Sequence, residues 1–384
     1  MTPDTIFLTD PDMSANELST LESVLKTPRL SMGPVTELFE NTFASYVGRK
    51  YGVAVSSGTI GLWLVLHAYG IGPGDEVITS PISWTQVSHA ITLCGAKPVL
   101  ADIDYWTVTL SPLKVAEKIT PKTRAILAGN TNGHPAHWEG LTALAQEHNL
   151  LLLEDSCEAI GSRYGGKMVG NFGDCAVFDF SQPSALTCGE GGMILTDDIE
   201  IARKLRYMRN RKLEDRFAAP VTAFPPLQAG ISEVTAALAF AQLSRIEQIL
   251  ENRKKVEGYY LNHVQTFEGI KPPYIAPEVD EVHWFLYVVH LGTRFSKSSR
   301  DAILSDLKLH EVEAYALCQP MHMQYHYQQQ HGYKKTDFKV AEKIADRALA
   351  LPFHAHLAED EVGFIVETAK DASINIGAGS AIYL

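Results

Sequence analysis

Two segments of the sequence place small polar or acidic residues where an α/β fold binds ligands. Residues 56–59 read Ser-Ser-Gly-Thr after the apolar residues 52–55, and Asp155 follows the apolar run 150–153. If both runs are buried parallel strands, these residues lie at strand carboxyl ends, where such folds bind ligands. A helix that begins there attracts an anion through its free N–H groups. The plainer alternatives are an N-cap at Ser57 or Thr59 and a structural carboxylate at Asp155.

Short apolar runs alternate with helical patterns through most of the chain, as is typical of an α/β sheet with crossover helices. Several of the runs are apolar throughout, which predicts strands covered on both faces. The predicted strands cover residues 52–55, 76–79, 98–102, 124–128, 150–154, 175–180 and 192–196, and the helices between them residues 59–69, 85–94 and 141–147.

The pattern changes after about residue 246. A long charged helix is predicted over residues 247–267, then a strand within 284–291 and two helices over 297–307 and 358–372. This mixture indicates a smaller α+β domain. The sequence therefore predicts a large domain over residues 1–245 and a small domain over residues 246–384.

Composition excludes several classes of protein. Lys and Arg total 33 against 45 Asp and Glu, a formal net charge of -12 that disfavours binding to nucleic acid or to an anionic membrane. No signal peptide or apolar run of membrane-spanning length is present, so we expect a cytoplasmic protein. The five cysteines are scattered without a CxxC pair, which argues against a disulfide or metal framework.

The segment from Ala176 to Gly192 reads AVFDFSQPSALTCGEGG. It resembles the cofactor-lysine segment of the sugar aminotransferases, the DegT/DnrJ/StrS-like group of fold-type I pyridoxal phosphate (PLP) enzymes. In that group a lysine precedes the Gly-Glu-Gly-Gly turn, and Ser184 stands at its position here.

The resemblance extends over nearly the whole chain. It implies an α/β, fold-type I aminotransferase-like structure with a mostly parallel seven-stranded sheet in the large domain and a smaller C-terminal α+β domain. It also implies a homodimer with active sites at the subunit interface.

The same resemblance assigns cofactor roles residue by residue. Ser57, Gly58 and Thr59 match the turn that holds the cofactor phosphate. Trp84 matches the aromatic residue that stacks on the pyridine ring, and Asp155 matches the aspartate that pairs with the ring nitrogen, a contact that makes the ring an electron sink. Core packing by Trp84 is the alternative.

Three positions depart from the family pattern. A serine hydroxyl at position 184 cannot form the lysine Schiff base. Asp179 replaces a serine that binds the phosphate in relatives, and Gln228 replaces an asparagine that reaches the partner subunit's phosphate. Because the three changes occur together, we interpret them as natural divergence.

The substitute for the lysine as a base remains open at this point. Glu158, His134 and His322 are the nearest candidates, and each can equally be a hydrogen-bonded structural group. We list Ser184, Glu158 and His322 as the candidate catalytic residues.

The leading prediction is a divergent sugar aminotransferase-family enzyme. It would act on a keto sugar, expected to be nucleotide-linked, or on a related small keto compound, with noncovalently bound PLP or pyridoxamine phosphate (PMP) and no lysine internal aldimine. The alternative is a protein that keeps the fold, has lost the cofactor, and acts as a binding or scaffold subunit or performs cofactor-free chemistry.

Overall fold

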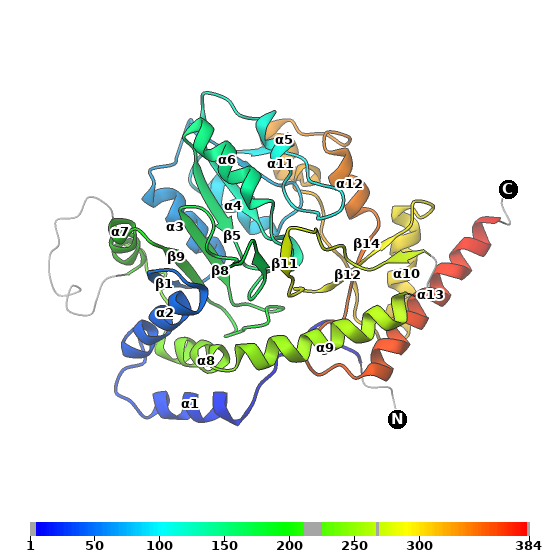
Figure 1. The fold of residues 1–384 in the computed structure, drawn as a ribbon, viewed down its shortest axis with the longest axis horizontal. Helices are drawn as coiled ribbons and strands as arrows, with labels where there is room; N and C mark the ends of the chain where they lie inside the picture. The colour runs from blue at the N-terminus through cyan, green and yellow to red at the C-terminus, as the bar shows by residue number, and fades with distance from the viewer. Residues whose placement is uncertain (1–4, 211–224, 266–268, 382–384) are drawn as a thin grey trace.

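A computed structural model describes residues 5–210, 225–265 and 269–381 of the chain. At its centre lies one seven-stranded sheet with the strand order β1-β9-β8-β5-β4-β2-β3 (Figure 1). The strands are β1 (Tyr51–Val55), β2 (Glu76–Thr79), β3 (Lys97–Leu100), β4 (Thr123–Gly129), β5 (Leu151–Asp155), β8 (Cys175–Asp179) and β9 (Gly192–Thr196).

The sheet is mostly parallel. Strands β3, β2, β4, β5 and β8 pair in parallel, and β9 pairs antiparallel with both β8 and β1. All seven strands confirm the prediction to within a few residues. The sheet confirms the predicted fold class.

Alternating side chains of the central strands pack against two different layers, because successive residues of a strand point to opposite faces. Ile126 and Leu152 pack with α6 (Trp138–His148) and the C-terminal region. Leu127 and Leu153 pack in a second cluster that contains apolar residues of α3 (Gly58–Ala68), α4 (Thr85–Leu93) and α7 (Ile199–Arg209). The sheet is therefore buried on both faces, as its apolar strands predict.

The C-terminal region contains a second sheet with the order β10-β12-β14-β13. The long helix α9 begins at Ile246 and runs along this region (Figure 1). The elements are α9 (Ile246–Val264), β10 (Ile270–Lys271), β12 (Tyr287–Leu291), α10 (Lys297–Leu309), β13 (Tyr315–Ala316), α11 (Tyr325–His331), α12 (Lys339–Ala345), β14 (Ala348–Leu351) and α13 (Glu359–Ala381). The predicted helices and strand are confirmed.

A small three-stranded sheet joins the two regions. The hairpin β6 (Arg163–Tyr164) and β7 (Lys167–Met168) extends from the chain after β5 and pairs with β11 (Val279–Glu281). Such two-residue strands have no periodic pattern in the sequence, so they were not predicted. The short helix α5 (Pro112–Ala116) precedes β4.

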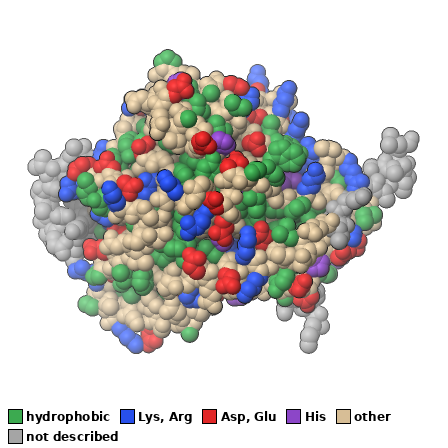
Figure 2. Space-filling model, viewed as in Figure 1, with side chains coloured by type: hydrophobic (Ala, Val, Ile, Leu, Met, Phe, Trp, Pro, Cys, Tyr) green, Lys and Arg blue, Asp and Glu red, His purple; other side chains and the backbone are tan. Residues whose placement is uncertain are grey.

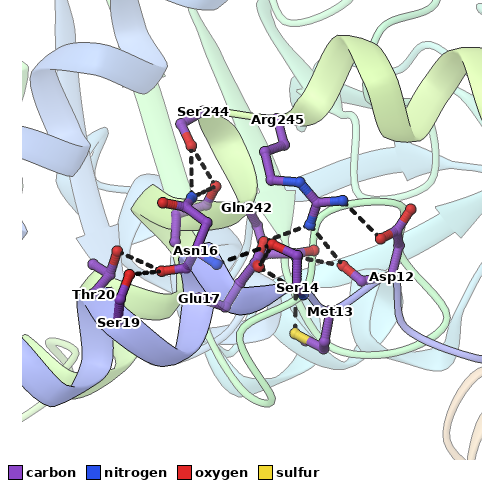
Figure 3. Close-up of polar contacts among 11 residues, drawn as sticks. Asp12, Met13, Ser14, Asn16, Glu17, Ser19, Thr20, Gln242, Ser244 and Arg245 are labelled. Carbon is purple, nitrogen blue, oxygen red and sulfur yellow. Dashed lines mark hydrogen bonds and ion pairs between the residues drawn. The ribbon is translucent and has the colours of Figure 1, made fainter.

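The N-terminal helices α1 (Ala15–Leu25) and α2 (Pro34–Val47) pack on α8 (Glu233–Leu243). Figure 3 shows how α1 is held at the junction of α8 and α9. Arg245 donates to Asp12 and Glu17, both at 2.8 Å, and Gln242 Nε2 donates to Glu17 at 2.8 Å. Glu17 is only 1% exposed. Burial opposes its charge, but hydrogen bonds from Ser14 and Arg245 outweigh this effect and lower its pKa to about 2.

Charges of both signs are interspersed over the face of the molecule that Figure 2 shows. Within the described residues, no helix is long and apolar enough to cross a membrane.

We predict that Arg245→Ala destabilises the protein by about 3 kcal/mol, since it leaves buried Glu17 without its cationic partner. Urea unfolding measures the loss. The control is Lys26→Ala, which breaks the exposed ion pair of Lys26 with Glu22 on α1 and should change stability by less than about 0.5 kcal/mol. Equal losses in the two variants would contradict the assigned role of the network.

Candidate functional site

Two cavities adjoin at the carboxyl ends of the parallel strands. The larger has a volume of about 800 Å³ and the smaller about 130 Å³. Trp84, Glu158 and Phe285 line both, so the two form one continuous site. We call it the sheet-end cavity.

The sheet topology brings together residues that are far apart in the sequence. Asp155 and Asp179 are the last residues of the neighbouring strands β5 and β8, and Gly58 begins α3 directly after β1. Trp84 is the N-cap residue of α4, which follows β2. Gly58, Thr59, Trp84, Asp155, Glu158 and Asp179 all line the smaller cavity. The structure thus places six of the predicted site residues around one cavity.

The Asp179 carboxylate lies against the N-terminus of α3. Its Oδ2 accepts a hydrogen bond of 2.6 Å from the Gly58 N–H, and its Oδ1 accepts one of 2.8 Å from the Ser181 N–H. The Ser181 hydroxyl also donates to Oδ1. Asp179 therefore occupies the N–H group that would otherwise bind an external anion. Ser57 acts as the N-cap, since its Oγ accepts from the Ile60 N–H at 3.3 Å.

Gly192 permits the close approach that this contact requires. A Cβ atom at position 192 would lie 2.8 Å from the carbonyl carbon of Ser57 and 2.9 Å from the Gly58 nitrogen. Only glycine lets β9 pass this close to the start of α3. This steric requirement explains the second glycine of the Gly-Gly pair that ends the aminotransferase-like segment.

Three carboxyl groups face the cavity, and no cation offsets them there. Among the described residues that line the two cavities, none is Lys, Arg or His. Burial, and secondarily the charge on Asp179, raises the pKa of Asp155. Burial raises the pKa of Glu158 to about 8, against hydrogen bonds from the Asn132 N–H and Trp84, and the charge on Asp155 adds to the rise. The site therefore favours protons or cations over anions.

Asn132 is a positioning residue that the sequence did not reveal. It adopts a left-handed conformation with φ of 53° after β4. Its N–H donates to Glu158, and its Oδ1 accepts from the Leu286 N–H at 3.0 Å. Asn132 thereby connects the β4 end of the sheet to the segment before β12. Its only signal in the sequence is a pair of turn-forming residues, Asn132-Gly133.

Phe285 is the second unpredicted residue of the site. Its ring lies edge-on to Trp84, with centroids 6.0 Å apart and planes at 81°. Trp84 is 44% exposed, so one part of its surface remains available to a ligand. Phe285 comes from the C-terminal region, and no spacing rule links it to Trp84.

Ser184 lies next to the cavity lining rather than within it. Gln182 and Pro183 line the smaller cavity, and the Ser184 N–H donates to the Ser181 carbonyl oxygen at 3.1 Å. Its short side chain leaves this side of the cavity to its neighbours.

The two candidate histidines do not line the sheet-end cavity. His322 is fully buried, and its Nε2 lies 3.0 Å from Glu342 Oε1. His134 is bonded to the Pro135 carbonyl oxygen and to the Ala276 N–H, and burial lowers its pKa. Gln228 is exposed and also lies outside the cavity lining. Of the predicted catalytic residues, only Glu158 faces the cavity directly.

Comparison with known proteins identifies the lineage. Residues 11–370 match the model of the DegT/DnrJ/EryC1/StrS aminotransferase family. The chain belongs to this family. The predicted resemblance and its fold are thereby confirmed.

The names of two curated relatives refer to sugar metabolism. GDP-perosamine synthase of Caulobacter vibrioides is 35% identical over 360 residues, which cover 93% of this chain and 95% of that protein. Spore coat polysaccharide biosynthesis protein SpsC of Bacillus subtilis is 33% identical over 371 residues, covering 94% and 95%. Among solved structures, the aminotransferase TlmJ from Streptoalloteichus hindustanus matches with a TM-score of 0.89 and 28% identity, covering 97% of this chain and all of that one.

The residues of this family member fit only one end of PLP. Asp155 and Trp84 are suited to the pyridine ring. At the phosphate end, however, Asp179 already accepts from the Gly58 N–H. A phosphate about 4 Å from this carboxylate would be repelled by about 4 kcal/mol per pair of unit charges at an effective dielectric constant of about 20. The site therefore does not fit the phosphate-bearing cofactor.

We predict that Glu158→Gln stabilises the protein increasingly as pH rises from 5 to 8. The folded-state pKa of Glu158 is about 8 against an ordinary value of 4.5. The wild type therefore loses stability as pH rises through this window, because only the unfolded state ionises freely. The gain should grow by about 3–4 kcal/mol between the two pH values.

Denaturant unfolding at pH 5 and pH 8 measures this difference. The matched control is Glu190→Gln, at an exposed position before β9, which should differ from the wild type equally at both pH values. A pH-independent effect of Glu158→Gln would show that Glu158 ionises as freely in the folded protein as in the unfolded chain.

Proposed function

We propose that this member of the sugar aminotransferase family binds a sugar or a related small hydroxylated compound in the sheet-end cavity without performing lysine-dependent transamination. The single observation that carries this proposal is the hydrogen bond between the Asp179 carboxylate and the Gly58 N–H. It places a negative charge where the family holds the cofactor phosphate. By the resemblance of residues 176–192 to the cofactor-lysine segment, Ser184 stands at the position of the lysine, so the proposal takes both attachments of the cofactor to be altered.

The sugar part of the proposal has support from the relatives and from the lining. The printed names of the Caulobacter and Bacillus relatives refer to sugar and polysaccharide synthesis. Side-chain amides and aromatic rings suit a polyhydroxylated ligand, because amides exchange hydrogen bonds with hydroxyl groups and rings cover the apolar face of a sugar. The larger cavity has both, in Gln319, Gln324, Gln328, Trp84 and Phe285.

A nucleotide-linked keto sugar is a further part of the proposal, by analogy with the GDP-perosamine synthase. Its diphosphate would lie outside the cavity, since no described Lys, Arg or His lines it. The family plan also supports a homodimer, in which Gln228 would face the partner subunit. We further propose a cytoplasmic location and a domain boundary at residue 245, directly before α9.

A second candidate function is favoured by one specific observation. Asp155 and Trp84, the residues suited to a pyridine ring, lie together at the cavity. They support noncovalent binding of PLP or PMP without a lysine. The protein would then be an enzyme related to a lysine-less dehydratase. This candidate requires that the cofactor phosphate tolerates Asp179 or displaces it from the α3 N-terminus.

Absorbance titration with PLP, and separately with PMP, discriminates the two candidates. We expect no saturable binding to the wild type. The single variant Ser184→Lys should also show no saturable binding, since Asp179 still accepts the hydrogen bond of the Gly58 N–H. The double variant Asp179→Ser, Ser184→Lys should bind PLP at least tenfold more tightly than either single variant.

Asp179→Asn is the matched control, because it keeps the size of the side chain and removes its charge. If repulsion by the carboxylate excludes the phosphate, this variant gains affinity for both cofactor forms. Saturable binding of PLP or PMP to the wild type would overturn the leading proposal in favour of the second candidate.

A further inference from the structure

We propose that the ligand of the sheet-end cavity carries a primary amine, held as an ammonium ion by Asp155, Glu158 and Asp179 beside the carboxyl ends of β5 and β8. This inference rests on the proposed function, the binding of a small hydroxylated compound. It assigns an amine, in place of a keto group, to the part of the ligand that lies in the smaller cavity.

The first observation is the charge of the cavity. Asp155 is 8% exposed at the end of β5, and apart from Cys157 no described residue donates a hydrogen bond to its carboxylate. The remaining acceptor capacity of this carboxylate therefore faces the cavity. A buried carboxylate with so few donors favours either a proton or a cation, and an ammonium group supplies three donors.

The second observation is independent of the carboxylates. The cavity continues from these groups into a space of about 800 Å³ lined by neutral amides, hydroxyls and rings. Trp84 and Phe285 stand at the passage between the two parts, since they line both. A ligand with a charged end of amine size and an uncharged, hydroxylated body matches this division in polarity and in volume.

Two other occupants fit less well. A metal ion requires ligand atoms within about 2–2.6 Å, and in the described part of the chain no group of three or more His, Cys, Asp and Glu side chains is arranged to hold one. An ammonium ion bonds at about 2.7–2.9 Å, so its acceptors can lie further apart. An anionic ligand end would meet three carboxyl groups without a cationic residue in the described lining. The chemistry of the cavity therefore selects an organic cation.

Binding of an ammonium ion should also change the protonation of the site. Glu158 is largely protonated at pH 7, because burial raises its pKa to about 8. A bound cation favours the ionised carboxylate and so releases protons. Proton release is a signature that a neutral sugar in the same cavity does not produce.

The test is isothermal titration calorimetry of the full-length wild type with glucosamine, N-acetylglucosamine and glucose at pH 7 and low salt. The three probes share a ring and differ in the amine. We expect glucosamine to bind at least tenfold more tightly than the other two. The heat of glucosamine binding should vary with the ionisation enthalpy of the buffer in the direction of proton release.

Asp155→Asn and Asp179→Asn should each weaken glucosamine binding at least tenfold and leave the weak binding of glucose within twofold. Glu190→Gln, at an exposed position, is the matched control and should bind like the wild type. Thermal melting of each variant without ligand establishes that it is folded.

Equal affinity for the three probes would overturn the amine inference and leave the proposed sugar binding intact. Binding of none of them would overturn the inference as well. The cofactor titration separates that result from failure of the proposed function, which shows itself as saturable binding of PLP or PMP to the wild type.

Discussion

The functional interpretation depends on one hydrogen bond, from the Gly58 N–H at the start of α3 to the Asp179 carboxylate. The N-terminus of a helix that follows a parallel strand is the natural anion site of an α/β fold. Here the chain supplies that anion itself. The carboxylate stabilises the helix N-terminus by about 1–3 kcal/mol, so any external phosphate must compete with an interaction that is already part of the fold.

The same protein shows how a buried carboxylate is accommodated when it serves structure alone. Glu154 is fully buried and accepts hydrogen bonds from Asn130, Ser156 and the N–H groups of Gly170 and Phe172. The carboxylate of its neighbour Asp155 has Cys157 as its only described donor. The contrast between adjacent residues of β5 follows from the pleat, which turns Glu154 toward a packed layer and Asp155 toward the cavity. Asp155 and Glu158 are thus poised for a ligand in a way that Glu154 is not.

Membership of an aminotransferase family and a divergent site are compatible, because the fold and the chemistry depend on different residues. The family match covers residues 11–370, a span that includes the apolar strands, the helices and the glycine turn. Those features position the cavity whatever it binds. Asp179 and Ser184 face or adjoin the cavity, so the proposed change of ligand is compatible with the same scaffold.

The sequence by itself determined the seven central strands, because each is a short apolar run whose burial on both faces requires that composition. It also placed Asp155 and residues 56–59 at the carboxyl ends of strands, and hence at one edge of the sheet, although the strand bounds differ from the predicted ones by up to two residues. The family resemblance added Trp84 and Asp179 to the same site. The tertiary structure alone decided that Asp179 fills the α3 N-terminus, that His322 pairs with Glu342 away from the cavity, and that Phe285 and Asn132 complete the site. Some of these contacts join segments separated by more than a hundred residues, and the others depend on the direction of one side chain. Neither kind of contact produces a periodic pattern in a single sequence.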